Sequence, residues 1–265
     1  MRQPPLRPFR AVGICLTLLA LAAPAVAQSD DEDPREGEPL ELTTEQGRDA
    51  VGMFKVHVKE KKEPGEIIQL MEELATEGAH SDISKELVKF VKHRYDAVEV
   101  AAVKLLGTQR DEVARKALLK IAKWSRNYKP HLGPEAVKSL GYVGYGGKRG
   151  FNQLLDLFYA VKDNKVKRNI IKTFGQQKEK LAVPLLIALL DEPKPGSANA
   201  ASNPPASFWQ ARYKDWRYLS ATTVRSLEAI IGRRFFKSED ALKWVKTEGK
   251  KLGIKYERPR DPWVG

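Results

Sequence analysis

The chain has 265 residues, of which 42% are hydrophobic and 30% charged, a composition typical of a folded protein with one large domain or a short repeat array. Its formal net charge of +12 favours anionic partners but says nothing about the fold. Cys15 is the single cysteine, which excludes disulfides within the chain and a thiolate metal site of several cysteines.

Residues 1–27 have the pattern of a cleavable secretory signal peptide. Arg2, Arg7 and Arg10 precede an apolar run over residues 11–23, and Ala-Val-Ala at 25–27 forms a small-x-small cleavage site. The run is shorter than the roughly 20 apolar residues that a transmembrane helix needs. We therefore expect an exported protein, periplasmic or secreted, without a membrane segment after cleavage. An uncleaved anchor is the alternative.

Residues 28–42 are strongly acidic. The stretch SDDEDPREGEPLE has seven acids in this range against Arg35 and few apolar residues, which predicts a disordered linker. Without the three arginines of the leader and the net −6 of this linker, residues 43–265 carry +15. The linker could serve as a solubilising spacer or fold back on the basic part of the chain.

From Thr43 onward the apolar residues recur at helical spacing, and no segment alternates as a strand would. A capping box at Thr43 and Gln46, Pro134 in a first turn and Asp163 before an apolar-periodic run indicate helix starts. Ser238 precedes another such run. The sequence therefore predicts an all-α fold of about nine helices. Two apolar faces illustrate the spacing: Val113, Ala117, Leu118 and Ile121, and then Phe151, Leu154, Leu155, Phe158 and Val161.

An internal repeat has a period of 34 residues. AVKLLG at 102–107, AVKSLG at 136–141 and IIKTFG at 170–175 match in kind at every column except one. The final glycines, Gly107, Gly141 and Gly175, are expected to end helices in the left-handed conformation. A period of this length is typical of stacked helix pairs, each of which buries its apolar face against its neighbours.

The glycine-rich stretch GYVGYGGKRG at 141–150 does not form a phosphate-binding loop. Arg149 follows Gly147-Lys148 where serine or threonine is required, and Tyr142 stands in place of the first glycine. We expect a flexible turn over 144–150. A weak anion contact through Lys148 and Arg149 is the alternative.

The chain resembles HEAT-repeat proteins of the short bacterial type. The resemblance rests on DAVEVAAVKLLG (96–107), PEAVKSLG (134–141), DNKVKRNIIKTFG (163–175) and the second-helix segment LAVPLLIALLDEP (181–193). The stretch at 223–245 is similar to a closing repeat. The resemblance implies an α-solenoid of antiparallel helix pairs over 43–265. Tetratricopeptide repeats share the period and stay as a rival, and Glu99 departs from the basic residue frequent in the family.

One lysine column follows the repeat. Lys104, Lys138 and Lys172 hold the same place in successive units, and adjacent helices would set them about 10 Å apart. Such a column could bind an anionic partner, or it could simply solvate an exposed helix face. In the fourth unit the column is expected to break at Glu228 or Ala229.

An insertion at about 193–216 interrupts the repeats. PKPGSANAASNPP at 193–205 predicts a structureless loop, and insertions of this kind often lie on the binding face. Aromatic side chains beside arginine are typical of interaction hot spots. The alternative is a helix that buries its aromatic side chains as core. The candidate binding residues are Trp209, Arg212, Tyr213, Trp216 and Arg217.

The sequence contains no catalytic motif. His57, His80, His93 and His131 are scattered without metal-ligand spacing, so we expect no catalytic residue, cofactor or metal. The resulting prediction is a non-catalytic interaction scaffold that recognises an acidic protein partner. The alternative is a binder of an anionic polymer or of the cell envelope. Nucleic acid is disfavoured because the predicted compartment holds little of it.

Overall fold

The computed structural model describes residues 33, 35, 37–194 and 203–263. The chain divides into two units, Met1–Asp33 and Pro34–Gly265, and the helices that are described all lie in the second. The predicted signal peptide 1–27 and residues 195–202 of the predicted insertion lie outside the described residues.

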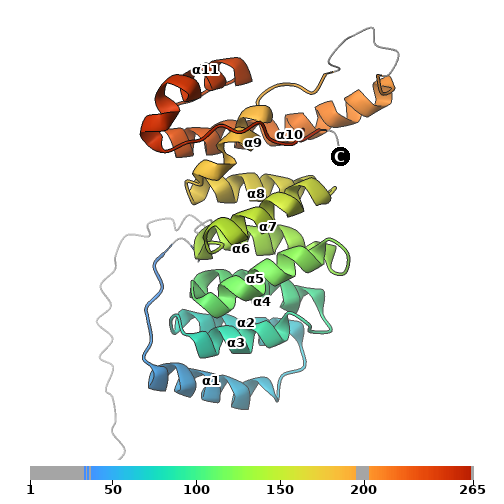
Figure 1. Cartoon of the computed structure of the whole chain (residues 1–265). Helices are drawn as coiled ribbons and strands as arrows, with labels where there is room; N and C mark the ends of the chain where they lie inside the picture. The colour runs from blue at the N-terminus through green and yellow to red at the C-terminus, as the bar shows by residue number, and fades with distance from the viewer. Residues whose placement is uncertain (1–32, 34, 36, 195–202, 264–265) are drawn as a thin grey trace, which may run out of the picture. The chain divides into compact units, whose positions relative to one another are not determined.

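The described part of the chain is helical (Figure 1), with eleven α-helices and no β-strand, so the all-α prediction is confirmed and the helix number exceeds the expected one. Its only bridge pairs Glu41 with Ala79. The α-helices are α1 (Thr44–Val58), α2 (Pro64–Thr76), α3 (Ser81–Phe90), α4 (Asp96–Gln109), α5 (Glu112–Ser125), α6 (Gly133–Val143), α7 (Gly147–Ala160), α8 (Asn164–Gln176), α9 (Val183–Ala188), α10 (Ala206–Ile231) and α11 (Ser238–Glu248), and the 3-10 helices are η1 (Pro130–Leu132), η2 (Lys180–Ala182) and η3 (Gly249–Leu252).

Several helices begin where the sequence indicates. Thr43 and Gln46 form the predicted capping box at α1. The carboxylate of Asp163 accepts a hydrogen bond of 2.7 Å from the backbone of the first turn of α8. Asp191 accepts one of 2.9 Å from the backbone N–H of Ser238 at the start of α11. Such bonds satisfy N–H groups that have no partner inside their own helix.

The helices of the second unit pack in two rows. Helices α4, α6, α8 and α10 contact one another in chain order, and α3, α5 and α7 contact one another in a second row. Cross contacts of α3 with α4, α5 with α6 and α7 with α8 join the rows. The same succession can be followed along the ribbon (Figure 1).

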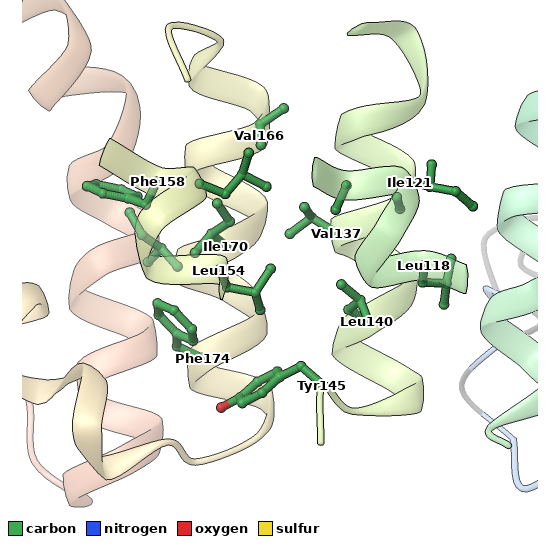
Figure 2. Close-up of a cluster of buried hydrophobic side chains, with 14 of the residues drawn as sticks. Leu118, Ile121, Val137, Leu140, Tyr145, Leu154, Phe158, Val166, Ile170 and Phe174 are labelled. Atoms are coloured by element: carbon green, nitrogen blue, oxygen red, sulfur yellow. The ribbon is translucent and has the colours of Figure 1, made fainter. Parts of the chain in front are cut away.

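The core lies between the two rows. Figure 2 shows Leu118 of α5 near Leu140 of α6, and Leu154 of α7 near Ile170 of α8. All four side chains are buried. Burying a side chain of this size contributes about 1.5–3 kcal/mol relative to leaving it exposed, so the apolar stripes read from the sequence are the main stabilising feature of these helices.

The prediction that Gly107, Gly141 and Gly175 end their helices is wrong. Each lies inside its helix, and none has a positive φ. A Cβ on Gly107 would lie 2.8 Å from Oγ of Ser139 in α6, and a Cβ on Gly175 would lie 2.8 Å from Cα of Ser226 in α10. At Gly107 and Gly175 a neighbouring helix therefore approaches too closely for a side chain, whereas the atom nearest to a Cβ on Gly141 is Oε1 of the Gln176 side chain.

Hydroxyl groups link the same helices. Oγ of Ser139 donates to the carbonyl of Val103 in α4 (3.1 Å), and Oγ1 of Thr173 donates to the carbonyl of Val137 in α6 (3.0 Å). Ser226 lies against α8 in the place that Ser139 takes against α4. The one column of the repeat that does not match in kind therefore holds these hydroxyl groups.

Within the predicted linker, Arg35 and residues 37–42 are described and make contacts with the helical unit. Leu42 and Ala79 are joined by a hydrogen bond of 3.2 Å, and the Ala79 N–H donates to Leu40 at 2.6 Å. The buried guanidinium of Arg35 pairs with Glu135 and donates to Oγ of a serine in α6 at 2.9 Å. Composition suggested disorder because these contacts depend on backbone groups and on one arginine, not on apolar content.

The second half of the predicted insertion belongs to a helix. Residues 206–216 form the first turns of α10, which runs for 26 residues and ends at Gly232, where φ is 75°. The last described residues pack on this helix, because the carbonyl of Trp263 accepts a 2.6 Å bond from Nε of Arg212. Of the predicted insertion before Ala206, the described residues 193, 194 and 203–205 are not helical.

Candidate functional site

A groove lies along α6, α8 and α10 in the described part of the chain. Its volume is about 760 Å³. Five lining residues are cationic, and none is acidic. Charge of a single sign in a concave surface raises the local concentration of the opposite ion. We call this feature the basic groove and define it by Lys138, Lys165, Arg168, Lys172 and Arg225.

Three of these cations occupy equivalent places in successive helices. Ser139, Thr173 and Ser226 are the residues that contact the preceding helix of the row. The residue directly before each of them has its side chain in the groove. These residues are Lys138 in α6, Lys172 in α8 and Arg225 in α10.

The predicted break of the column at Glu228 or Ala229 is therefore wrong. Gly232 follows Ala229 by three residues, but it caps α10 in the left-handed conformation and nothing lies within 4 Å of a Cβ added there, so it is not the counterpart of Gly175. The residue of α10 that contacts Gly175 of α8 is Ser226. Arg225, directly before it, therefore takes the place of the lysine in the column. The cationic series thus continues into the fourth unit.

Lys104, by contrast, lies outside the basic groove. It is half-buried in a separate cavity that is also lined by Glu38 and Glu72. The ordered segment 37–42 passes over this part of α4. The predicted column is consequently divided, with Lys138 and Lys172 in the groove and Lys104 beside acidic neighbours.

Two groove residues were missed by the sequence analysis. Lys165 and Arg168 precede Lys172 by seven and four residues, so all three fall on one face of α8. This helical spacing is the signal that could have found them. The guanidinium of Arg168 also lies 4.7 Å from the ring centroid of Tyr218, a cation–π contact that orients it.

Lys148 and Arg149 occupy a different place. Both are exposed in the first turn of α7, and Arg149 lines a cavity of about 450 Å³ between α5 and α7. The predicted turn is shorter than expected, because Gly147 and Gly150 already belong to α7. The structure does not bring Lys148 and Arg149 together with the basic groove.

The aromatic segment is divided between internal and exposed contacts. Nε1 of Trp216 donates to the carbonyl of Leu190 at 3.2 Å, and the side chain packs partly against the core. Trp209 is half-buried, whereas Tyr213 is 41% exposed and its ring lies tilted against that of Trp216, with ring centroids 5.5 Å apart. The contacts of Trp216 therefore agree with the alternative prediction, in which the helix buries its aromatic side chains as core.

The two arginines of the segment also differ. Arg212 is half-buried, and its guanidinium lies 4.6 Å from the ring centroid of Phe208 while Nε donates to the carbonyl of Trp263. Arg217 is exposed. Arg212 therefore binds the last described residue of the chain. Tyr213 and Arg217 remain predicted binding residues.

Burial also affects one lysine near the groove. Desolvation lowers the pKa of Lys167 on α8, and the nearby negative charge of Asp215 opposes this effect. Nζ of Lys167 lies 5.5 Å from the ring centroid of Phe158. Lys167 does not line the basic groove. Its ammonium group packs against the buried ring of Phe158 instead.

A second cluster of polar side chains joins α4 to the loop before α6. Asp96 and Glu99 lie one turn apart on α4, and His131 lies in η1. One potential ligand atom from each residue falls within 4.8 Å of the other two. Ligand spacing in the sequence does not reveal this cluster, because His131 is more than thirty positions from Asp96 and Glu99.

Comparison of the chain with protein-family models, with curated proteins and with solved structures finds no match. Across the described residues, every helix is either too short or too polar to cross a lipid bilayer.

Proposed function

We propose that residues 43–265 form an α-solenoid of HEAT-like repeats that acts as a non-catalytic scaffold for an acidic partner. The order of helix contacts and the hydroxyl bonds of Ser139 and Thr173, each to a carbonyl 36 residues earlier, support a repeated unit. The leader-like pattern at 1–27 supports an exported protein, periplasmic or secreted.

The observation that carries the function is the single sign of charge in the basic groove. Lys138, Lys172 and Arg225 come from three neighbouring helices, which are about 8–10 Å apart at usual interaxial distances. A ligand with anionic groups at the same spacing would meet each cation in turn. Lys165 and Arg168 widen the cationic surface along α8.

An acidic peptide segment has the required spacing. In a polyproline II conformation the chain rises about 3.1 Å per residue with three residues per turn, so every third side chain points the same way about 9 Å further on. Glutamates at every third position would thus align with the three cations. An extended acidic segment of a protein partner is the ligand class that we assign to the groove.

A binding measurement tests this assignment. A fluorescent 15-residue peptide with glutamate at every third position is titrated with the purified protein, and anisotropy is followed at low and moderate salt. Replacing Lys138, Lys172 and Arg225 together by glutamine should weaken binding about tenfold or more, because three close charge contacts are lost. Moderate salt should weaken the wild-type complex as well.

A second triple variant serves as the control. Lys116, Lys148 and Arg149 are exposed on α5 and α7, and their replacement by glutamine removes the same charge outside the basic groove. The control should bind like the wild type. If both variants lose affinity equally, net charge alone attracts the ligand. The protein would then be a general binder of anionic polymers.

A further inference from the structure

Three potential metal ligands meet at the start of α4. Asp96 and Glu99 are separated by one helical turn, so their carboxylates lie on the same face, and His131 reaches them from η1. Nε2 of His131 is 3.1 Å from Oε2 of Glu99 and 3.9 Å from Oδ1 of Asp96. The three ligand atoms lie within 4.8 Å of one another.

A single imidazole nitrogen faces both carboxylates in this cluster. One N–H can donate a well-directed hydrogen bond to only one oxygen, whereas a metal ion can bind the nitrogen and both oxygens together. Zinc binds histidine nitrogen and carboxylate oxygen at about 2.0–2.2 Å in a tetrahedron, which sets ligand atoms about 3.4 Å apart. The contact of His131 with Glu99 is close to this spacing.

The two carboxylates differ in burial. Glu99 is fully buried, and its Oε1 accepts from Nζ of Lys129, which fixes the side chain and leaves Oε2 directed toward His131. The side chain of Asp96 is 80% exposed and can rotate to shorten its 3.9 Å distance. Lys129 balances one of the two negative charges, which leaves one for a cation in the cluster.

The donor set selects among metals. Magnesium and calcium prefer sites built from oxygen alone, and copper(I) prefers sulfur, whereas one imidazole with two carboxylates suits divalent transition metals, of which zinc accepts this set in a tetrahedron. We propose that Asp96, Glu99 and His131 bind one zinc ion, with Lys129 as a neighbouring charge on Glu99 and a fourth position open to water. The ion would join the loop between α5 and α6 to the first turn of α4.

Calorimetry of the purified protein without a histidine tag tests the proposal. After dialysis against a chelator, zinc chloride is titrated into the protein in a non-coordinating buffer. We expect one ion per chain and at least a tenfold loss of affinity in His131→Ala and in Asp96→Asn. Asp96→Asn alters an exposed side chain and therefore keeps the test valid if His131→Ala does not fold. His57→Ala, an exposed change on α1, should bind zinc like the wild type.

Lys129→Met should change the zinc affinity in the opposite direction. Removal of this cation should strengthen zinc binding, because the positive charge next to Glu99 no longer opposes the ion. Zinc should also raise the melting temperature of this variant more than that of the wild type. Absence of binding at 1 mM zinc, or binding that Asp96→Asn and His131→Ala leave unchanged, would show that the cluster is a hydrogen-bonded ion group and no metal site.

Discussion

At the residue scale, the repeat glycines determine how closely neighbouring helices approach. Gly175 lies against Cα and Cβ of Ser226, both 2.8 Å from the position that a Cβ would take. Since part of this contact is backbone, α8 and α10 would have to separate to admit even a methyl group. At Gly107 the crowding atoms belong to the side chains of Arg35 and Ser139.

Gly175→Ala should therefore lower the free energy of unfolding by about 1–3 kcal/mol, the usual cost of overpacking a close contact. The matched control is Gly52→Ala in α1, where nothing lies within 4 Å of the added Cβ. That change should stabilise the protein by about 0.5–1 kcal/mol through helix propensity. Urea unfolding of both variants checks the prediction, and equal effects of the two changes would contradict it.

Tyr145 links stability to pH. Its hydroxyl donates to Glu179 at 2.7 Å, and burial, followed by this bond, raises the pKa of the buried phenol above its ordinary value. The stability that comes from the neutral phenol is complete below the ordinary tyrosine pKa of about 10. It is lost as pH rises above that value, because the unfolded chain releases the proton first.

Tyr145→Phe should be about 1 kcal/mol less stable than the wild type at neutral pH, since one buried hydrogen bond is lost. Above pH 10 the difference should narrow by up to about 1.4 kcal/mol per pH unit. Denaturant unfolding between pH 8 and 11 measures both curves. Parallel curves over the whole range would argue against a buried neutral phenol.

At the element scale, the segment 37–42 behaves as part of the helical unit. Its backbone pairs with Ala79, and Arg35 anchors its start on α6 through Glu135. Arg35 is 1% exposed and Glu135 is 23% exposed, so this ion pair lies largely away from water. Removing one partner of such a pair leaves the other charge poorly solvated.

Arg35→Ala should lower the free energy of unfolding by about 2 kcal/mol, somewhat less than for a fully buried pair. Hydrogen exchange at the amides of Leu42 and Ala79 should become faster. As a control, Lys61→Ala removes an exposed ion pair with Glu66 and should change stability by less than about 0.5 kcal/mol. Unchanged exchange at Leu42 and Ala79 in Arg35→Ala would mean that Arg35 does not hold the segment.

The elements also show how far sequence reasoning extends. Apolar spacing and capping residues such as Thr43 and Asp163 predicted the helices, because both depend on contacts within a few residues. Sequence spacing placed the fourth unit in the wrong register of the lysine column. Whether a glycine caps its own helix or contacts a neighbouring helix depends on the tertiary structure. The cluster of Asp96, Glu99 and His131 was missed because η1 brings together residues more than thirty positions apart.

At the scale of the whole helical unit, like charges in the basic groove oppose folding and favour binding. Lys172 is exposed in a groove with four further cations. Lys172→Gln should therefore raise the melting temperature of the free protein by about 1 °C at low salt, because one repulsive charge is removed. Calorimetric scans at low and high salt measure it, and a lower melting temperature at low salt would show that Lys172 is held by favourable contacts instead.

Lysine footprinting tests the central claim most directly. The protein is acetylated briefly with and without the glutamate-repeat peptide, and the modification of each lysine is measured by mass spectrometry. The groove assignment predicts that the peptide protects Lys138, Lys165 and Lys172 and leaves Lys116 and Lys148 as reactive as in the free protein. Equal protection of all five lysines, or protection of Lys116 and Lys148 alone, would contradict the assignment of the basic groove as the binding site.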